Sequence, residues 1–288
     1  MSPIATSEQL NSFVLTEADF QRVRELAYRL AGISLGPHKR DMVYSRLVRR
    51  LRALNLASFR VYLDQVEKGG TEVQPFLNAL TTNLTYFFRE EHHFPILVRH
   101  VQSCAGQGRI VRLWSAASST GEEPYSMAIS LADGFNTLTP PIRLLATDID
   151  TDVLKRAQAG IYPIDAVNRL PNTTLRRYFL RGTGPQEGNV RIRPEIQALV
   201  SFRQINLLSD TWDVEPPLDA IFCRNVMIYF DKPTQREVLE GFVQVMAPDG
   251  LLFMGHAESL QHAMDLVKPL GQTVYCLTPQ AIAAKSRK

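Results

Sequence analysis

The sequence predicts an α/β protein in two parts: a small N-terminal helical bundle, and a doubly wound, mostly parallel sheet with an inserted antiparallel β-subdomain. At 288 residues the chain exceeds the size that one hydrophobic core comfortably fills. Apolar residues recur at helical spacing from residue 15 to about residue 80. From about residue 108, short apolar runs alternate with helix-length segments, which is the pattern of a parallel sheet covered by helices.

Composition excludes several classes of protein. Hydrophobic residues make up 45% of the chain and charged residues 21%, as in ordinary soluble globular proteins. No run approaches the roughly 18 apolar residues of a membrane-spanning helix, and the first residues lack the basic and apolar regions of a signal peptide. Cys104, Cys223 and Cys276 are far apart in the sequence, so we expect reduced thiols in a cytoplasmic protein and no metal site.

Residues 1–80 are assigned to the helical domain, as four or so short helices separated by glycines. One of these helices has an apolar face formed by Val43, Leu47, Leu51 and Leu54. Arg49 and Arg52 fall on the opposite side of this helix, and Arg46 and Arg50 fall on its flank.

This helix lies in a strongly basic stretch of a nearly neutral chain. Between residues 39 and 60 there are seven basic residues and one acidic residue, whereas the net charge of the whole chain is only +3. With almost no acid nearby to neutralise them, these arginines repel one another, which indicates a binding surface for an acidic partner. A solvated helix face is the alternative interpretation.

Residues 93–288 are assigned to the α/β domain, which a linker at residues 81–92 joins to the helical domain. Strands are predicted at residues 110–114, 142–148, 218–223, 251–254 and 273–277. Helices are predicted to start at residue 122 and to span residues 153–159 and 234–246.

Residues 172–205 interrupt this alternation. Three short strands are predicted here, at residues 177–180, 190–193 and 199–203, with glycine-rich turns between them. We interpret the segment as an antiparallel flap inserted into the α/β domain. The tail after Pro279 is expected to be disordered.

Candidate binding residues lie at the carboxyl ends of the predicted strands, where open α/β sheets bind ligands. The small side chains of residues 115–121 let a ligand approach the backbone at the start of a helix. Glu123 either faces this ligand or completes a helix-capping box with Thr120. Asp148 ends the second strand, where an acid commonly accepts hydrogen bonds from ribose hydroxyls, whereas Asp150 suits the following helix N-cap. Without a glycine-rich phosphate motif, these features favour a cofactor that contains a nucleoside.

Four segments resemble, in the expected order, the motifs of the CheR family: residues 83–90 (NLTYFFRE), 114–126 (WSAASSTGEEPYS), 146–150 (ATDID) and 222–231 (FCRNVMIYFD). CheR proteins are chemotaxis receptor methyltransferases. They use S-adenosylmethionine to form methyl esters on receptor glutamates, which leaves S-adenosylhomocysteine. The resemblance covers residues 15–278 and implies a Rossmann-like methyltransferase domain whose small-residue loop replaces the glycine-rich motif of many other methyltransferases.

The resemblance also implies a set of cofactor contacts. They fall on Asn83, Thr85, Arg89, Glu123, Asp148, Asn206, Leu207, Arg224 and Asn225. Asp148 suits the ribose hydroxyls, Glu123 suits the cofactor's ammonium, and Arg89 suits its carboxylate because a guanidinium offers a bidentate fork. Asn206 is expected to reach the adenine edge.

Arg89 and Tyr229 are the candidate catalytic residues, and the Tyr229 hydroxyl is expected to orient the substrate carboxylate. A glutamate with a pKa of ~4.3 is already ionised at neutral pH, so its methylation needs no general base. The alternatives are a core tyrosine and, for Arg89, a surface ion pair with Glu90 or Glu91. Cys223 is expected to pack as a small apolar side chain rather than to act as a nucleophile.

The partners implied by the resemblance are chemotaxis receptors. Family members meet the acidic methylation region of the receptor with the basic helix, which here carries Arg46, Arg49 and Arg52. The flap resembles the subdomain with which some members capture the C-terminal pentapeptide of a receptor by strand addition. The glycines in its turns are Gly182, Gly184 and Gly188. We therefore expect a cytoplasmic monomer that is recruited to membrane receptor arrays without inserting into the membrane.

Two other functions remain as alternatives. A nucleic-acid methyltransferase would use the arginine helix to bind phosphates, but the net charge is close to neutral and an N/D-P-P-Y/F motif is absent. A regulator that binds the cofactor without turnover is disfavoured because Arg89, Asp148, Arg224 and Tyr229 are all present.

Overall fold

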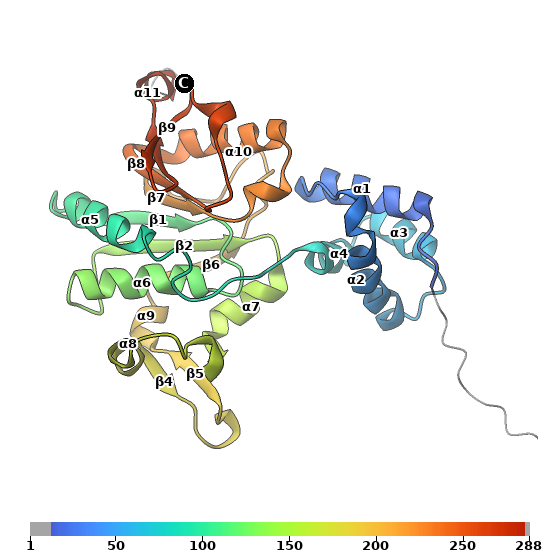
Figure 1. Cartoon of the computed structure of the whole chain (residues 1–288), viewed down its shortest axis with the longest axis horizontal. Coiled ribbons are helices and arrows are strands. Elements are labelled where there is room, and N and C mark those ends of the chain that lie inside the picture. The colour runs from blue at the N-terminus through green and yellow to red at the C-terminus, as the bar shows by residue number, and fades with distance from the viewer. Residues whose placement is uncertain (1–12, 286–288) are drawn as a thin grey trace, which may run out of the picture. The chain divides into compact units, whose positions relative to one another are not determined.

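The computed structural model describes residues 13–285. The chain divides into two compact units, and the division falls between Leu80 and Thr81. In Figure 1 the first unit is blue to cyan and the second runs from green to red. Within the described range, no helix is long and apolar enough to cross a lipid bilayer.

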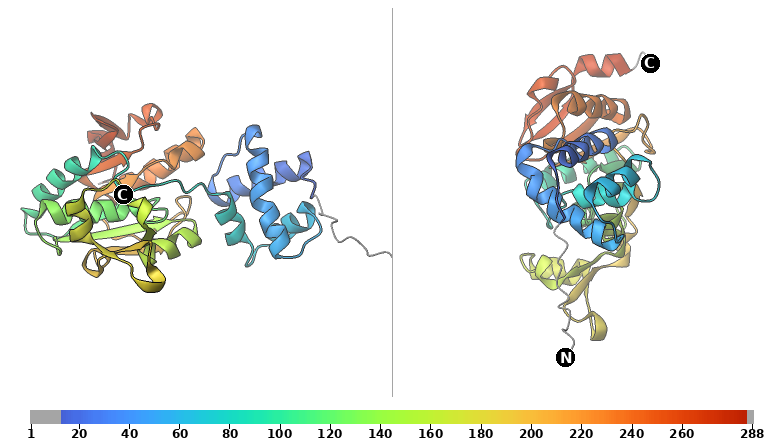
Figure 2. Two further views of the ribbon diagram at one scale, coloured as in Figure 1. Left: turned by 60° about the horizontal axis from the view of Figure 1, so that its bottom comes forward. Right: turned by 90° about the vertical axis from the view of Figure 1, so that its right-hand side faces the viewer.

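The first unit is a bundle of short helices around an aromatic and aliphatic core (Figure 2). Its elements are α1 (Glu17–Ala31), the 3₁₀ turn η1 (Pro37–Lys39), α2 (Arg40–Ala53), α3 (Phe59–Glu67) and α4 (Val73–Leu80). α1 begins at a capping box between Thr16 and Asp19 and ends at Gly32 in the left-handed conformation. The predicted helical bundle is confirmed.

The arginines of α2 have different environments. Arg49 and Arg52 are exposed, and the residues of the predicted apolar face are buried except Leu54 at the helix end. Arg50 forms a bidentate pair with Glu72, at 2.8 Å from Nε to Oε1 and 2.9 Å from Nη2 to Oε2. The expectation that no acid neutralises these arginines is therefore wrong for Arg50, because Glu72 comes from a later turn of the chain. Arg46 donates to the Leu80 carbonyl oxygen, at 3.1 Å from Nη1.

The second unit is built on a seven-stranded sheet with the strand order β6-β2-β1-β7-β8-β10-β9 (Figure 1). Its strands are β1 (Val111–Ser115), β2 (Ile142–Asp148), β6 (Val200–Gln204), β7 (Leu218–Cys223), β8 (Met246–Met254), β9 (Val267–Gly271) and β10 (Val274–Leu277). β6, β2, β1, β7 and β8 are parallel, and β10 and β9 are antiparallel to their neighbours. The order reverses at β1, so the carboxyl ends of β2, β1 and β7 surround the point where such sheets bind ligands.

Helices pack on both faces of this sheet. They are α5 (His93–Ala105), α6 (Glu122–Gly134), α7 (Thr151–Ala159) and α10 (Lys232–Val245). Successive side chains of β7 enter two different hydrophobic clusters: Phe222 packs with Leu97 of α5 and Ile129 of α6, whereas Ile221 packs with Phe242 of α10. Every residue of β7 is buried, as expected for a central strand covered on both faces. The predicted doubly wound, mostly parallel sheet is confirmed.

An antiparallel sheet is present as predicted, but one of its strands was assigned wrongly. The sheet has the order β3-β5-β4, from β3 (Ile161–Pro163), β4 (Phe179–Arg181) and β5 (Asn189–Ile192). The stretch at 199–203 instead forms β6, which pairs in parallel with β2 as the edge of the main sheet. Short strands that are close in the sequence are typical of a hairpin, and this local pattern predicted an antiparallel partner for residues 199–203. The partner in the structure, β2, lies more than 50 residues earlier.

The antiparallel sheet and the short elements around it form the flap. These elements are η2 (Ile164–Ala166), α8 (Asn172–Tyr178), η3 (Gly184–Gln186) and α9 (Pro194–Gln197). The β4–β5 hairpin projects away from the main sheet in Figure 1 and in the right-hand view of Figure 2.

The segment after Thr278 is ordered, which corrects the expected disorder of the tail. It forms α11 (Pro279–Lys285). Two 3₁₀ turns lie earlier in the chain, η4 (Met227–Tyr229) and η5 (Gln261–Ala263). Thr278 caps the helix by accepting from Ala281 N at 3.1 Å, and Lys285 Nζ donates to the Met246 carbonyl oxygen at 2.6 Å. Thr278 followed by Pro279 is a helix-start signal, which explains why this segment forms a helix. Residues 286–288 of the predicted tail lie outside the described range.

Candidate active site

The loop after β1 turns sharply into α6 and presents backbone groups at the carboxyl end of the sheet. Ser118 N donates to the Thr147 carbonyl oxygen at 2.8 Å, which ties the loop to β2. Gly121 has a φ of +98° at the helix N-cap. A Cβ on Gly121 would lie 2.8 Å from the Tyr162 hydroxyl oxygen and 2.9 Å from the Ala157 Cβ. Both the conformation and the space therefore require glycine here.

Asp148 lies at the centre of the site. Its two carboxylate oxygens accept from Asp150 N at 2.9 Å and from Ser119 N at 2.8 Å. Burial raises the pKa of Asp148 to about 6, although these hydrogen bonds favour the ionised form. Asp150 caps α7, as predicted, and also accepts from Asn83 Nδ2 at 2.7 Å, which places Asn83 beside the Asp148 turn.

Glu123 faces the sheet rather than the end of its own helix. The capping-box interpretation is wrong: Gly121 is the N-cap, and Thr120 Oγ1 donates instead to Glu122 Oε2 at 2.6 Å. Glu123 Oε1 accepts from Ser115 Oγ at 2.7 Å. Burial raises the pKa of Glu123. The capping motif fails because the left-handed Gly121 moves the helix start one residue beyond Thr120.

Arg224 follows β7 and is the buried cation of the site, with a side chain only 2% exposed. Its Nε lies 3.2 Å from Glu123 Oε2, and its Nη2 donates to the Arg89 carbonyl oxygen at 2.7 Å. Its guanidinium also lies 5.7 Å from the centre of the Phe222 ring. Arg224 thus joins the segment before α5 to the helix after β1.

The segment of residues 81–92 crosses the site in an irregular conformation. Arg89 Nη1 donates to the Leu84 carbonyl oxygen at 2.9 Å, and its guanidinium lies 5.8 Å from the Tyr86 ring centre. Its Nε is 4.0 Å from Glu90 Oε1, at the limit of an ion pair, so the ion-pair alternative describes only a weak contact. Thr85 is half-buried in the same segment.

Strained backbone is concentrated around these residues. Phe88, Glu90, Ser119 and Asn225 all have φ values between +48° and +60°. Such values are uncommon for residues other than glycine, and they are typical of functional sites where the surrounding contacts fix the backbone.

Glu90, Glu258 and His93 also contact the residues of this site, and no pattern in the sequence singles them out. Glu90 Oε1 accepts from His256 N at 3.2 Å and from Asn225 Nδ2 at 3.4 Å. Glu258 Oε2 accepts from Asn225 N at 2.9 Å, and burial raises the pKa of Glu258. Glu90 ends the motif at residues 83–90 and Glu258 lies outside the four motifs; the contacts of both join distant segments and leave no local pattern.

The remaining predicted cofactor contacts follow β6. Ile205 N donates to the Asp148 carbonyl oxygen at 3.2 Å, which brings the next two residues close to Asp148. Asn206 Oδ1 accepts from Leu208 N at 3.0 Å, and Leu207 is buried.

Cys223 is the last residue of β7, and Tyr229 lies six residues later. Tyr229 is half-buried at the end of η4. Cys223 is fully buried, and burial raises the pKa of its thiol well above the usual value, so it packs as an apolar side chain and is no nucleophile.

The three glycines of the flap lie at the β4–β5 connection. Gly184 and Gly188 have positive φ values, and a Cβ on Gly182 would overlap the Gln186 carbonyl oxygen. The base of the flap contacts the loop before α6, because Tyr162 Oη donates to the Thr120 carbonyl oxygen at 2.8 Å.

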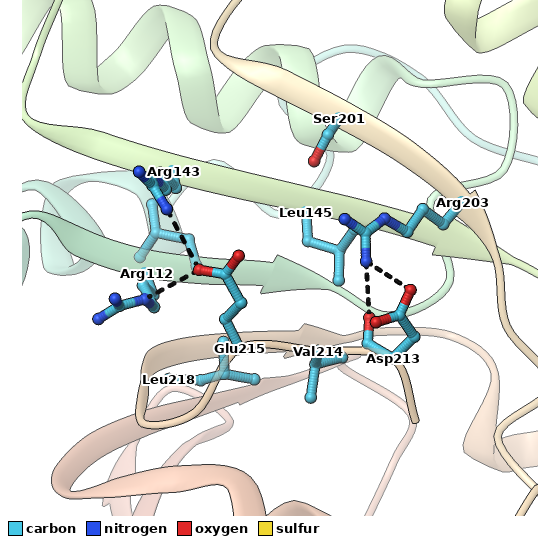
Figure 3. A pocket seen from close by; sticks show the side chains of 10 residues that line it. Arg112, Arg143, Leu145, Ser201, Arg203, Asp213, Val214, Glu215 and Leu218 are labelled. Atoms are coloured by element: carbon cyan, nitrogen blue, oxygen red, sulfur yellow. Dashed lines mark hydrogen bonds and ion pairs between the residues drawn. The ribbon is translucent and has the colours of Figure 1, made fainter. Parts of the chain in front are cut away.

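A pocket elsewhere on the sheet, shown in Figure 3, is lined by residues of β1, β2 and β6 and of the segment before β7. Glu215 Oε2 is 3.2 Å from Arg143 Nη1 and 3.5 Å from Arg112 Nε. Asp213 Oδ2 is 2.7 Å from Arg203 Nη1. These charges are paired with one another and are partly or largely exposed, and the buried acids do not line the pocket, so this pocket is not the candidate active site.

Comparisons with known proteins show the family to which the chain belongs. Residues 83–276 match the family model of the CheR methyltransferase SAM-binding domain, and residues 18–81 match that of the CheR methyltransferase all-alpha domain. Chemotaxis protein methyltransferase 2 of Pseudomonas aeruginosa is 52% identical over 274 residues, which cover 95% of this chain and 97% of that protein. The chemotaxis protein methyltransferase of Salmonella typhimurium is 53% identical over 266 residues, which cover 92% and 91%. The chain therefore belongs to the CheR family of S-adenosylmethionine-dependent methyltransferases.

Proposed function

We propose that this enzyme transfers a methyl group from S-adenosylmethionine to glutamate side chains in the cytoplasmic region of chemotaxis receptors, which forms methyl esters. The observation that carries this proposal is the buried set of Asp148, Glu123 and Arg224 at the switch point of the sheet, in a chain whose relatives are named chemotaxis protein methyltransferases. Relatives with these names over more than nine-tenths of the chain do not favour a nucleic-acid methyltransferase.

The residues at this site fit S-adenosylmethionine. Asp148 keeps acceptor capacity for two ribose hydroxyls, since each of its oxygens receives one backbone hydrogen bond. Ser118 Oγ and Glu90 Oε2 are buried polar atoms without a hydrogen-bond partner among residues 13–285, as expected at a ligand site. We assign the cofactor's carboxylate to the guanidinium of Arg89, and the 26% exposure of this side chain supports that assignment.

When bound, the cofactor supplies an electrophilic methyl group on a sulfonium. The substrate glutamate is already ionised at neutral pH, so the protein does not have to remove a proton. We propose that the Tyr229 hydroxyl donates a hydrogen bond to the substrate carboxylate and holds one oxygen in line with the methyl group. Alignment of this kind contributes roughly 7–11 kcal/mol to many reactions. The groups around Arg224 are buried from solvent, and a site without water favours a reaction in which opposite charges cancel.

The direct test is the transfer of labelled methyl groups from S-adenosylmethionine to receptor-containing membranes. We expect label on receptor protein, and we expect mild base to release it because methyl esters hydrolyse. Base-stable label, or label in added RNA with a steep dependence on salt, would contradict the proposal.

We propose that Arg49 and Arg52 on α2 contact the acidic methylation region of the receptor, with Arg46 at the edge of this surface. The exposure of Arg49 and Arg52 supports this role, whereas Arg46 already donates to a backbone carbonyl. Replacing Arg49 and Arg52 by alanine is expected to lower receptor methylation without changing the affinity for S-adenosylmethionine. Arg60→Ala, which removes an exposed arginine of α3, is the matched control.

We also propose that the flap binds the C-terminal pentapeptide of receptors by strand addition at β4. β4 is an edge strand of the antiparallel sheet, so its outer backbone groups can pair with a peptide. Deleting residues 182–188 is expected to abolish binding to an immobilised receptor-tail peptide and to leave cofactor binding intact. No peptide binding by the intact protein would assign it to the members that work without the pentapeptide. In this proposal the enzyme is a cytoplasmic monomer that its receptors recruit to the membrane.

A further inference from the structure

Two buried carboxylates converge on one nitrogen of the active site. Glu90 Oε2 lies 3.9 Å and Glu123 Oε2 lies 3.2 Å from Arg224 Nε. The side chains of these two acids are 12% and 9% exposed. The resemblance assigned a cofactor contact to Glu123 but none to Glu90.

The two oxygens of Glu90 differ in their hydrogen bonds. Oε1 accepts from His256 N and Asn225 Nδ2 and is 4.0 Å from Arg89 Nε. Oε2 is buried, and within residues 13–285 it receives no hydrogen bond. Burial opposes ionisation of Glu90, but the charge of Arg224 and the hydrogen bonds to Oε1 outweigh it, so the pKa of Glu90 is lowered. Glu90 is therefore an acceptor-only carboxylate with one buried oxygen that needs a donor.

His93 cannot be that donor. Its Nε2 lies 2.9 Å from the Gln272 carbonyl oxygen, which can only accept, so Nε2 carries the hydrogen. Burial and the charge of Arg224 lower the pKa of His93 to about 4, so the ring is neutral and Nδ1 bears a lone pair. Nδ1 faces Arg224 Nη1 at 3.4 Å and lies 3.8 Å from Glu90 Oε2. His93 Nδ1 and Glu90 Oε2 are both acceptors, so they form no hydrogen bond with each other.

The charges nearby indicate what kind of donor fits. Glu90 and Glu123 carry the negative charges, and Arg224 and Arg89 carry the positive ones, so the cluster is balanced when all four are ionised. A zwitterionic amino-acid group preserves this balance, because its ammonium faces the two carboxylates and its carboxylate faces Arg89. An ammonium also offers three N–H donors, enough for both carboxylates. A hydroxyl offers one donor and brings no charge.

We propose that Glu90 and Glu123 together bind the α-ammonium of the cofactor's methionine end, with Glu90 Oε2 accepting one of its hydrogen bonds. Arg89 binds the carboxylate of the same group. Glu90 is thus a cofactor-binding residue in addition to those that the resemblance implied. This inference rests on the proposed cofactor site.

The test compares three ligands that differ in the relevant groups. S-adenosylmethionine has the amino-acid end and the sulfonium, S-adenosylhomocysteine has the amino-acid end and a neutral thioether, and 5′-methylthioadenosine has neither the amino-acid end nor the charge. Dissociation constants are measured by calorimetry for the full chain and for Glu90→Gln. Glu91→Gln is the matched control, because Glu91 is the adjacent glutamate and is exposed.

We expect Glu90→Gln to weaken S-adenosylmethionine and S-adenosylhomocysteine by about 10- to 100-fold, the usual effect of losing a charge-assisted hydrogen bond. Binding of 5′-methylthioadenosine is expected to change less than about threefold. Glu91→Gln is expected to bind all three ligands like the unmodified chain. If Glu90→Gln does not fold, Glu90→Asp, which withdraws the carboxylate by one methylene, is expected to show the same selective loss.

Three results overturn the inference. Equal weakening of all three ligands shows that Glu90 supports the loop rather than the ammonium. Weakening of S-adenosylmethionine alone shows that Glu90 faces the sulfonium, and unchanged binding of all three shows that it contacts no part of the cofactor. If the unmodified chain binds none of the ligands, the cofactor site itself is wrong, and with it the proposed function.

Discussion

The two ends of the main sheet carry similar charged residues in opposite environments. At the carboxyl ends, Asp148, Glu123 and Arg224 are each less than 10% exposed. At the amino ends, the side chains of Arg143 and Glu215 are 60% and 63% exposed. Water solvates the second set, whereas the first set depends on protein groups and a ligand to compensate the loss of solvation. Buried charge, rather than a pocket, therefore distinguishes the candidate active site from the opposite end of the sheet.

The largest effect is expected for Arg224→Met. This change removes the cation that faces Glu90 and Glu123 and leaves two buried carboxylates uncompensated. Losing one partner of a buried ion pair typically costs about 3–5 kcal/mol in the free energy of unfolding, which urea denaturation measures. Arg143→Met, which removes an exposed arginine from the other end of the sheet, is the control. Equal losses in the two variants would show that the two ends do not differ.

Large effects on turnover without loss of folding are expected for Tyr229→Phe and Arg89→Ala. Removing one positioned hydrogen-bond donor commonly lowers kcat about 10²- to 10³-fold. Tyr229→Phe is expected to keep the affinity for S-adenosylmethionine, whereas Arg89→Ala is expected to weaken it. Methyl transfer and calorimetry on the same preparations separate these effects, and turnover at the unmodified rate would remove the proposed role of either residue.

Cofactor affinity is expected to depend on pH through Asp148. Its pKa is raised to about 6, so below that pH the carboxyl is protonated and would lose the charge-assisted hydrogen bonds that we propose it accepts from the ribose. The dissociation constant should be flat above about pH 7 and rise up to tenfold per pH unit below pH 6. Unfolding does not explain this trend, because a raised carboxyl pKa makes the folded state less stable as pH rises from about 4 to 6, not as it falls. In Asp148→Asn, binding should be weak, and the change near pH 6 should disappear.

The smallest effect is expected at the amino ends of the strands. Glu215→Gln removes the acid that faces Arg112 and Arg143, but all three groups are partly in water. Exposed pairs contribute about 0.2–1 kcal/mol to stability, and less at high salt. Thermal unfolding and cofactor titration should both stay close to those of the unmodified chain. A substantial loss of cofactor binding would show that this pocket is coupled to the active site.

The parts of the fold that sequence predicts well have a local cause. The helical periodicity of the first unit and the buried run of β7 both appear in the structure as expected, because each depends on neighbouring residues in one element. β6 was misassigned because nothing within residues 199–203 distinguishes a parallel edge strand from a hairpin strand. Its pairing with β2 is decided by the tertiary structure.

The same distinction applies to the site. Asp148 was predictable because it ends a strand, and a strand end is visible in the sequence. The contacts of Glu123 were misread, because a local capping motif competes with a partner about 100 residues away, Arg224. For the same reason, the sequence suggests only a surface ion pair between Glu90 and Arg89. The other contacts of Glu90 are with Asn225, which follows β7, and with His256, which follows β8.

The pairing of β1 with β7 has a consequence for synthesis of the chain. Arg112 N, in β1, donates to Asp219 Oδ2, in β7, although 107 residues separate them. Contacts over such separations form late, and an emerging chain exposes unpaired apolar strands until they do. The helical bundle can fold while β1 still has an open edge on the ribosome. Only after β7 emerges can Arg224 meet Glu123, so the candidate active site is among the last parts of the protein to form.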